Sequence, residues 1–432
     1  MQTSLRRIAK KARRDKKHRF RDLYGMLNEG LLLDCWRYLN KRAASGVDRV
    51  TAREYERNLE GNVRELVERL KGKRYRAKLV RRVYIPKSNG RKRPLGIPAL
   101  EDKIVQLAAA RILTAIYEED FLPVSFGYRP RVGPRAAVRD VTDTLQWGKY
   151  SYVVEADIRG FFDNIDHEWM IRMLEQRIDD RAFMRLVTKW LKAGILERDG
   201  QVIHPVTGTP QEGIISPVLA NIYLHYALDL WFEKVVKRHC CGEAYICRYA
   251  DDFISAFRYK RDAGRFQRVL SKRLGKFGLE LSEEKTRVVS FSRFRKEEKT
   301  SFEFLGFEFR WGVSRRGKDI IKRRTSRKRL RMSLKNLKRW CREKRNVRLE
   351  RLFEELNSKL RGYYNYYGII GNYKSIKEFF LRGLRILFKW LNRRSQTLSF
   401  NYREFFNALK RYGIERPRIT ERCENQLKLS LT

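Results

Sequence analysis

The stretch CRYADDFISAF, residues 247–257, places two adjacent aspartates, Asp251 and Asp252, inside an otherwise apolar run of strand-forming residues. Two carboxylates side by side in such a run are costly, because each loses water while it repels the other. The flanking segments AYICRY and FISAF predict a hairpin with a tight turn at Ala250-Asp251-Asp252. Taken alone, the pair fits two exposed acids in a turn as well as it fits two ligands of a metal ion.

A third aspartate lies in a second predicted strand, SYVVEADI, residues 151–158. Alternation along this strand predicts that Asp157 shares a face with Val153 and Glu155, and that it falls at the strand end just before Arg159-Gly160. A hairpin tip beside a strand-end aspartate would gather three carboxylates, whose repulsion magnesium would offset through oxygen ligands. Two such ions a few ångströms apart are the established arrangement for in-line phosphoryl transfer.

The charge balance of the whole chain indicates a polyanionic partner. Its 432 residues contain 97 Lys and Arg against 51 Asp and Glu, a formal net charge of +46. Such an excess favours nucleic acid as the partner, and the length predicts two to four domains. No run of eighteen apolar residues occurs, so we expect no membrane span and no membrane partner.

The cysteines and the N-terminus indicate in which compartment of the cell the protein is found. Six scattered cysteines indicate a reducing compartment. The cluster of His239, Cys240, Cys241 and Cys247 has no C-x2-C pair, which disfavours a zinc site. The N-terminus, MQTSLRRIAKKARRDKKHRF, is basic and nearly free of acids. It is predicted to be a flexible nucleic-acid-binding arm, with an organellar transit peptide as the alternative.

Local patterns place elements on either side of the two predicted strands. Helical spacing of apolar residues predicts helices over residues 20–75, about 100–118 and 133–147. The segments RRVYIPK and RKRPLGIP flank Ser88-Asn89-Gly90, which predicts a hairpin with a basic tip. The sequence SPVLAN predicts a helix in which Ser216 is the N-cap and Pro217 the first helical residue.

A strongly basic segment follows near the C-terminus. Residues 322–342 contain eleven Lys and Arg and no acid, with Leu330, Leu334 and Leu337 at helical spacing. This pattern predicts a helix with one packed face and basic faces that contact a polyanion. The tyrosines of RGYYNYYG, residues 361–368, fit either a core or a base-stacking platform. The predicted nucleic-acid-binding residues are Lys322, Arg323, Arg324, Arg327, Lys328, Arg329, Arg331, Lys335, Lys338 and Arg339.

Seven motifs in order, RPLGIP, SFGYRP, ADIRGFFDNIDH, PQEGIISPVLAN, YADD, EEKT and LGF, resemble those of a reverse transcriptase. The resemblance covers roughly residues 45–400 and is greatest to the bacterial group II intron reverse transcriptase/maturases, here without an HNH endonuclease domain. It implies an α+β, right-hand polymerase fold with fingers and an antiparallel palm sheet, followed by an α-helical thumb/maturase domain. The expected domains are a basic arm and helical extension over 1–75, fingers and palm over 76–315, thumb/maturase over 316–398, and a possible DNA-binding remnant over 399–432.

The resemblance also implies roles for single residues. Asp157, Asp251 and Asp252, together with the backbone carbonyl of Ile158, match the metal ligands of the palm. Lys285 matches the lysine proposed to protonate the leaving pyrophosphate, although a plain surface lysine is the alternative.

Four further residues match positions around the incoming nucleotide. The bulky gate that disfavours a 2′-hydroxyl corresponds to Phe162, and Gln211 matches the motif beneath nucleotide and template. Lys87 and Arg93 match the fingers residues that hold the triphosphate. One departure is Glu212, which stands where the family commonly has glycine in PQGG.

The implied function is an RNA-directed DNA polymerase that uses two Mg²⁺ ions, with Mn²⁺ as a substitute, to copy RNA from a DNA primer with dNTPs. The resemblance further implies that the protein binds its intron RNA to assist splicing and retrohoming, in a bacterial cytoplasm and associated with the nucleoid. One alternative is a domesticated relative in defence or linked to CRISPR. The other is an RNA-binding splicing factor whose polymerase is vestigial.

Overall fold

A computed structural model of the chain describes residues 2–86, 92–197, 199–204, 206–209, 213–294, 300–314, 316–394 and 398–421. The chain forms two compact units, one of residues 1–133 and 154–288 and the other of residues 134–153 and 289–432. The chain passes from one unit to the other three times: between residues 133 and 134, within β3 (Tyr152–Arg159) and within β9 (Arg287–Ser290). The units do not follow the predicted domain limits, which stay a prediction.

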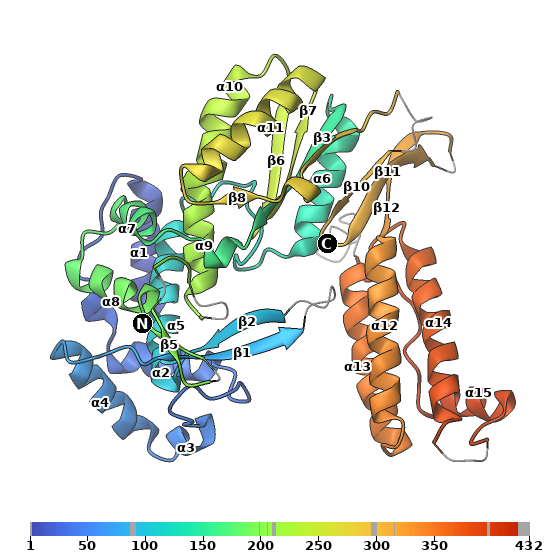
Figure 1. Ribbon diagram of the computed structural model, residues 1–432, viewed down its shortest axis with the longest axis horizontal. Helices are drawn as coiled ribbons and strands as arrows, with labels where there is room; N and C mark the ends of the chain where they lie inside the picture. The colour runs from blue at the N-terminus through green and yellow to red at the C-terminus, as the bar shows by residue number, and fades with distance from the viewer. Residues whose placement is uncertain are drawn as a thin grey trace, which may run out of the picture. The chain divides into compact units, whose positions relative to one another are not determined.

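The central sheet of the first unit is the one that carries the predicted carboxylates. Its strand order is β6 (Ala244–Tyr249), β7 (Asp252–Phe257), β3, β8 (Glu280–Leu281), and β9 also pairs with β3. The β6–β7 and β3–β8 pairs are antiparallel. In β3 the side chains of Val154, Ala156 and Ile158 are buried, as alternation predicts, although Val153 is buried as well. The helix α11 (Lys260–Gly275) packs against β7 and β8 (Figure 1).

A second sheet and the N-terminal helices complete the first unit. The predicted hairpin is formed by β1 (Val80–Pro86) and β2 (Lys92–Ile97), antiparallel, with β4 (Ile195–Leu196) and β5 (Val202–Ile203) beyond β1. The remaining helices are α1 (Gln2–Arg14), α2 (Glu29–Tyr38), α3 (Ala52–Glu56), α4 (Leu59–Lys71), α5 (Leu100–Tyr117), α7 (His167–Glu175), α8 (Arg181–Leu191), α9 (Ser216–Leu224) and α10 (Lys237–His239).

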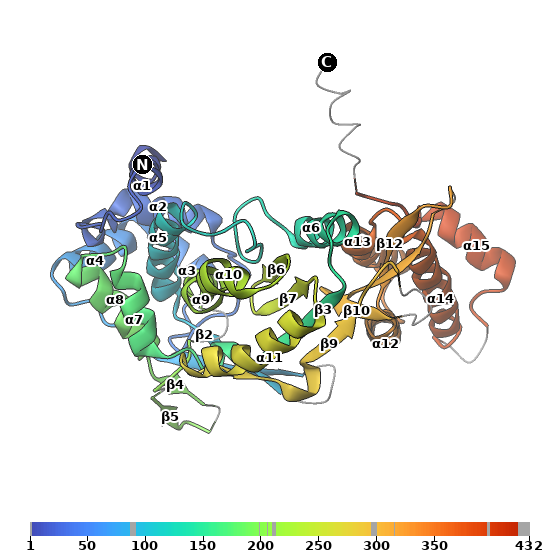
Figure 2. The same ribbon diagram turned by 90° about the horizontal axis from the view of Figure 1, so that it is seen from above.

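Two predictions for this unit are wrong in detail. The N-terminus is not a flexible arm over residues 2–14 but the helix α1, which buries Ile8 and Ala12 and packs against α5 (Figure 2). The N-cap of α9 is Ile215, and Ser216 lies inside the helix, because its hydroxyl pairs with Thr209 Oγ1 at 2.7 Å instead of capping.

The second unit combines a small sheet with long helices. Its elements are α6 (Pro134–Trp147), the antiparallel strands β10 (Ser301–Phe304), β11 (Phe307–Val313) and β12 (Asp319–Thr325), and the helices α12 (Arg327–Lys344), α13 (Leu349–Tyr367), α14 (Tyr373–Leu391) and α15 (Tyr402–Arg411). The helices α12, α13 and α14 run side by side (Figure 1). Leu330, Leu334 and Leu337 of α12 lie in their shared core, as the spacing predicts, and α15 adds Phe405 and Leu409 to it.

Three tyrosines of residues 361–368 belong to this core or pack against it: Tyr363, Tyr364 and Tyr367. Tyr364 is fully buried, and its hydroxyl donates to the carbonyl of Glu415 at 3.2 Å. Tyr363 stacks on Phe379 with ring centroids 3.7 Å apart. Of the two readings of this segment, the structure therefore supports packing for these two rings.

The fold class predicted from the sequence, α+β with an antiparallel palm sheet and a helical C-terminal domain, is confirmed. Helices in the described ranges lack the combination of length and apolar character that a membrane crossing requires.

Candidate active site

The three predicted carboxylates lie on neighbouring strands of the central sheet. Asp251 occupies the turn between β6 and β7, and Asp252 is the first residue of β7, paired with Tyr249. Asp157 lies near the end of β3, the strand beside β7. The next residue, Ile158, pairs with Leu281 of β8. The sheet therefore brings two distant parts of the sequence, near residues 157 and 251, onto adjacent strands.

Lys285 reaches the same place from a short 3₁₀ turn, Glu283–Lys285, that follows β8. Its Nζ lies 2.5 Å from Asp157 Oδ2, and the backbone N–H of Ser282 donates to the carbonyl oxygen of Asp157 at 2.8 Å. The Lys285 side chain is 63% exposed and that of Asp157 36% exposed. An ion pair this exposed stabilises a protein by less than about 1 kcal/mol, so the pair can open readily.

The carboxylate and carbonyl oxygens around Asp157 are suited to bind a hard divalent cation. Carboxylate and carbonyl oxygens are the ligands that magnesium prefers, and Asp157 already holds a cationic group, the ammonium of Lys285. In the described part of the chain, no three His, Cys, Asp or Glu side chains are already drawn together as a metal site. Asp157 would therefore help to hold such an ion through the carboxylate that now pairs with Lys285.

Phe162 lies directly after β3, in the 3₁₀ turn Phe161–Asp163. Its backbone carbonyl accepts a hydrogen bond from the N–H of Thr209 at 2.8 Å. Gly208, with φ of +92°, lies so close to the same turn that a Cβ would come within 2.8 Å of the Asp163 carbonyl oxygen. The segment that leads into Gln211 is thus held against the turn that carries Phe162.

Several predicted nucleotide-binding residues lie outside the described residues. Lys87 and Gln211 are among them, and so is the side chain of Arg93. Glu212, which departs from the glycine of the family's PQGG, also lies outside the described residues. The backbone of Arg93 is in β2, where it pairs with Ile85 of β1. The roles of these residues stay predictions.

The basic segment predicted as one helix is a strand followed by a helix. Lys322, Arg323 and Arg324 belong to β12, and α12 begins at Arg327, with Ser326 as the N-cap. Arg324 forms a bidentate pair with Glu308 of β11, with N–O distances of 2.9 and 2.6 Å.

Arg323 also has protein partners. Its Nη2 donates to the carbonyl of Ile370 at 3.2 Å and lies 3.6 Å from Glu421. The predicted basic residues on α12 are exposed instead: Arg327, Lys328, Arg329, Arg331, Lys335, Lys338 and Arg339.

One group that the predictions missed lies directly behind the aspartate turn. Arg248, in β6, is fully buried and forms an ion pair with the equally buried Asp229. The sequence CRYADDFISAF, residues 247–257, already indicated such a group, because an arginine inside a buried apolar strand needs a specific set of partners.

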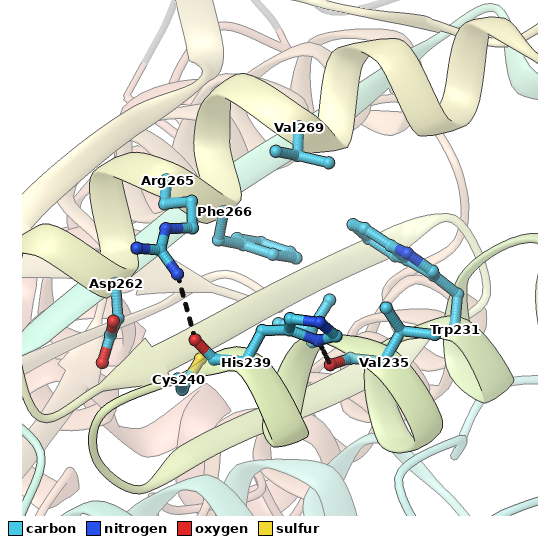
Figure 3. A pocket seen from close by; sticks show the side chains of 9 residues that line it. Trp231, Val235, His239, Cys240, Asp262, Arg265, Phe266 and Val269 are labelled. Carbon is cyan, nitrogen blue, oxygen red and sulfur yellow. Dashed lines mark hydrogen bonds between the residues drawn. The ribbon is translucent and has the colours of Figure 1, made fainter.

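A cavity of about 300 Å³ lies between α11 and the helical residues 231–239 with Cys240 after them (Figure 3). Trp231 and Phe266 stack with centroids 5.9 Å apart, and Arg265 donates to the carbonyl of His239 at 3.1 Å. None of the predicted catalytic residues lines this cavity. Burial, followed by the Asp262 carboxylate, raises the pKa of Cys240 to about 11, which keeps the thiol protonated and disfavours a thiolate metal ligand there.

The buried His225, in the helical run after α9, leads to a prediction about pH. Burial lowers its pKa to about 4, so the unfolded chain takes up a proton below pH 6.5 while the folded chain does not. Stability from this group is therefore lost as the pH falls from about 6.5 to 4. Asp102 acts in the opposite direction, because burial raises its pKa to about 6.

We expect His225→Phe to remove the histidine contribution and leave that of Asp102. The unfolding free energy of the wild type relative to the variant should fall by about 2 kcal/mol between pH 7 and pH 4.5. Urea unfolding at a series of pH values measures this difference, and parallel curves for the two proteins would show that His225 does not titrate in this way.

The strands, the carboxylates and their order along the chain define a polymerase palm, and sequence comparison agrees. The family model described as Reverse transcriptase (RNA-dependent DNA polymerase) matches residues 85–309, which is more than half of the chain. The chain belongs to the reverse transcriptase family. A second model, described as Group II intron, maturase-specific domain, matches residues 328–412.

The chain is also similar to individual proteins. The chain is 44% identical over 167 residues to the Group II intron-encoded protein LtrA of Lactococcus lactis subsp. cremoris, covering 38% of this chain and 27% of that protein. It is 35% identical over 238 residues to Protein YkfC of Escherichia coli (strain K12), covering 48% of this chain and 62% of that protein. The match spans less than two thirds of either relative. A solved structure of telomerase from Candida albicans, in complex with a fragment of telomeric RNA, aligns with 79% of this chain and 64% of that chain at 14% identity and a TM-score of 0.45.

Proposed function

We propose that the protein is an RNA-directed DNA polymerase that also binds group II intron RNA and assists its splicing and retrohoming. The observation that carries the polymerase proposal is the placement of the Asp251–Asp252 turn on the strand next to Asp157. Membership of the reverse transcriptase family supports the same activity. We further propose a cytoplasmic, nucleoid-associated location, which follows from the DNA target that retrohoming requires.

The proposed chemistry assigns separate tasks to the chain's own residues. Asp157, Asp251, Asp252 and the carbonyl of Ile158 would hold two magnesium ions, which would stabilise the attacking and the leaving oxygen of nucleotidyl transfer. Phe162 would limit the space at the 2′ position of the incoming nucleotide. Lys285 would leave Asp157 and place its ammonium near the pyrophosphate, where it can donate a proton.

The polymerase proposal is tested by primer extension. Wild-type protein is incubated with an RNA template, an annealed DNA primer, dNTPs and Mg²⁺, and the product is treated with RNase and DNase. A DNase-sensitive product of template length is expected, and it should disappear when a chelator removes the metal. An active, correctly folded preparation that yields no such product on several templates would contradict the proposal.

The maturase proposal rests on the match of residues 328–412 and on the basic surface of α12. The second candidate function, a splicing factor with a vestigial polymerase, is favoured by the same surface. Splicing that continues at full rate in a variant without polymerase activity would show that the two activities are separable. Such a result together with an inactive wild-type polymerase would select the splicing factor.

We expect the triple variant Lys328→Gln, Arg331→Gln, Lys335→Gln to bind intron RNA more weakly. These exposed residues follow one another at helical spacing on one side of α12, outside the face of the buried leucines. Each lost phosphate contact should reduce the slope of log K against log salt by about 0.7 to 0.9. Filter binding from 50 to 300 mM KCl measures this slope.

The matched control removes the same charge from α11 and its C-cap residue. The variant Arg268→Gln, Lys272→Gln, Lys276→Gln changes three exposed basic residues of the other unit. Equal slopes for the two variants would mean that only net charge matters and that α12 is not a specific contact surface.

A further inference from the structure

Arg248 uses all five of its guanidinium N–H groups inside the protein. Nε and Nη2 donate to the two carboxylate oxygens of Asp229 at 2.7 and 2.6 Å. Nη2 also donates to Ser125 Oγ at 2.7 Å, and Nη1 donates to Asn221 Oδ1 at 3.0 Å. The last bond, from Nη1, goes to the backbone carbonyl of Ala250 at 2.9 Å.

That last contact connects the buried arginine to the turn of the predicted metal ligands. Ala250 directly precedes Asp251 and has a φ of +57°, in the left-handed region. This conformation is unfavourable for a non-glycine residue, so surrounding contacts have to maintain it. Arg248 supplies one such contact from inside the core.

The partners of Arg248 come from three separate segments that are fixed to one another. Asn221 also donates from Nδ2 to the carbonyl of Gly127 at 2.6 Å. The loop at Ser125 pairs with β6, since the Phe126 N–H donates to the Arg248 carbonyl at 2.8 Å and the Arg248 N–H donates to the Val124 carbonyl at 2.8 Å. The aspartate turn is thereby tied to a helix and a loop that are distant in sequence.

A π-helical turn explains how one helix supplies two of these partners. Asn221 and Asp229 are eight residues apart, and at about 100° per residue an α-helix would place them about 80° apart around its axis. Residues His225–Asp229 form a π-helical turn, which takes more residues per turn and rotates Asp229 back toward the side of Asn221. π-helical turns are rare in proteins as a whole, and those that occur are often found at functional sites.

Stability alone does not account for this ion pair, because burying two charges costs solvation that burying an apolar pair would not. We propose that Arg248 is a positioning residue that fixes the Ala250 carbonyl and thereby sets the place of the Asp251 and Asp252 carboxylates. All of its side-chain bonds go to Asp229, Asn221, Ser125 and Ala250, so it acts through the turn and not on a substrate. This role adds a positioning residue to the proposed polymerase site, and its effect on catalysis rests on the proposed polymerase function.

The test compares Arg248→Lys with Arg177→Lys. A lysine keeps the charge but lacks the planar fork, so it cannot hold Asp229 and the Ala250 carbonyl together. Arg177 is the matched control. Its side chain is 3% exposed, its Nε lies 2.9 Å from Asp120 and it donates to the carbonyls of Ala12 and Asp15, far in sequence from the aspartate turn.

The readouts are thermal unfolding, Mn²⁺ affinity by electron paramagnetic resonance, and single-nucleotide addition. We expect both variants to lose thermal stability. Only Arg248→Lys should bind Mn²⁺ at least about fivefold more weakly and lower kcat roughly 100-fold, because a shift of about 1 Å at reacting groups costs that much. KM for the dNTP should change less than about threefold, because the fingers residues that hold the triphosphate are untouched.

Ser125→Ala provides a second variant if Arg248→Lys does not fold. It removes one support of the guanidinium while the charges stay paired, and we expect a two- to fivefold loss of Mn²⁺ affinity. Unchanged Mn²⁺ affinity in every folded variant, or an equal effect from Arg177→Lys, would overturn the positioning role. Mn²⁺ binding is measured without nucleotide addition, so an inactive wild type would contradict the proposed function while this comparison still decides the inference.

Discussion

The double variant Asp251→Ala, Asp252→Ala is expected to lose DNA synthesis by at least about 1,000-fold, because the carboxylates that would hold the metal ions are removed together. The backbone should tolerate the change, since Asp251 lies in the turn and Asp252 at the first position of β7, and neither is a core residue. Primer extension on an RNA template measures the loss, and Mn²⁺ titration should show fewer bound ions.

The control for this variant removes two acids from the same unit. Glu283 and Glu284 are exposed in the 3₁₀ turn that carries Lys285, and their replacement by alanine changes the net charge equally. We expect synthesis within about threefold of the wild type for this control, since exposed charges contribute little. Undiminished synthesis by the aspartate variant would contradict the assignment of the metal ligands.

The second large effect is expected from Gly127→Ala. A Cβ at Gly127 would lie 2.2 Å from the backbone nitrogen of Ala250 and 2.8 Å from the carbonyl carbon of Tyr249. Backbone atoms cannot rotate away as a side chain can, so either the loop or the aspartate turn has to move. A displacement of about 1 Å at the turn should lower nucleotide addition roughly 100-fold.

Gly133→Ala is the matched control for this substitution. Gly133 follows Gly127 in the same connection between α5 and α6, and a Cβ there would meet no atom within 4 Å. We expect wild-type activity for Gly133→Ala, and a shift of less than about 0.5 kcal/mol in its unfolding free energy. Similar activities of the two variants would show that the turn absorbs the strain without moving the aspartates.

Local patterns in the sequence were sufficient for much of the fold. Alternation predicted the buried face of β3, the paired apolar runs predicted β6 and β7, and the flanks of Asn89-Gly90 predicted β1 and β2. The spacing of Leu330, Leu334 and Leu337 predicted the packed face of α12. Each of these depends on side chains a few residues apart, which is the range over which strand and helix periodicity acts.

The prediction failed where a local pattern is compatible with two structures. Basic residues 322–324 continue the composition of α12, yet they lie in a strand because Glu308 and the neighbouring strand β11 pair with them. The same holds for Ser216, whose hydroxyl has a partner, Thr209, that no helix-start rule includes.

For the candidate site, the sequence alone determined which carboxylates are present, their order along the chain and the family to which they point. Only the tertiary structure decided that Lys285 forms an ion pair with Asp157 and that the backbone of Gly127 lies close to the aspartate turn. The same is true of the hydrogen bond from Arg248 to that turn. The physical reason is distance along the chain. Ser125 and Arg248 are 123 residues apart, and no periodicity reports a contact between side chains that meet only after the sheet and the helix have packed.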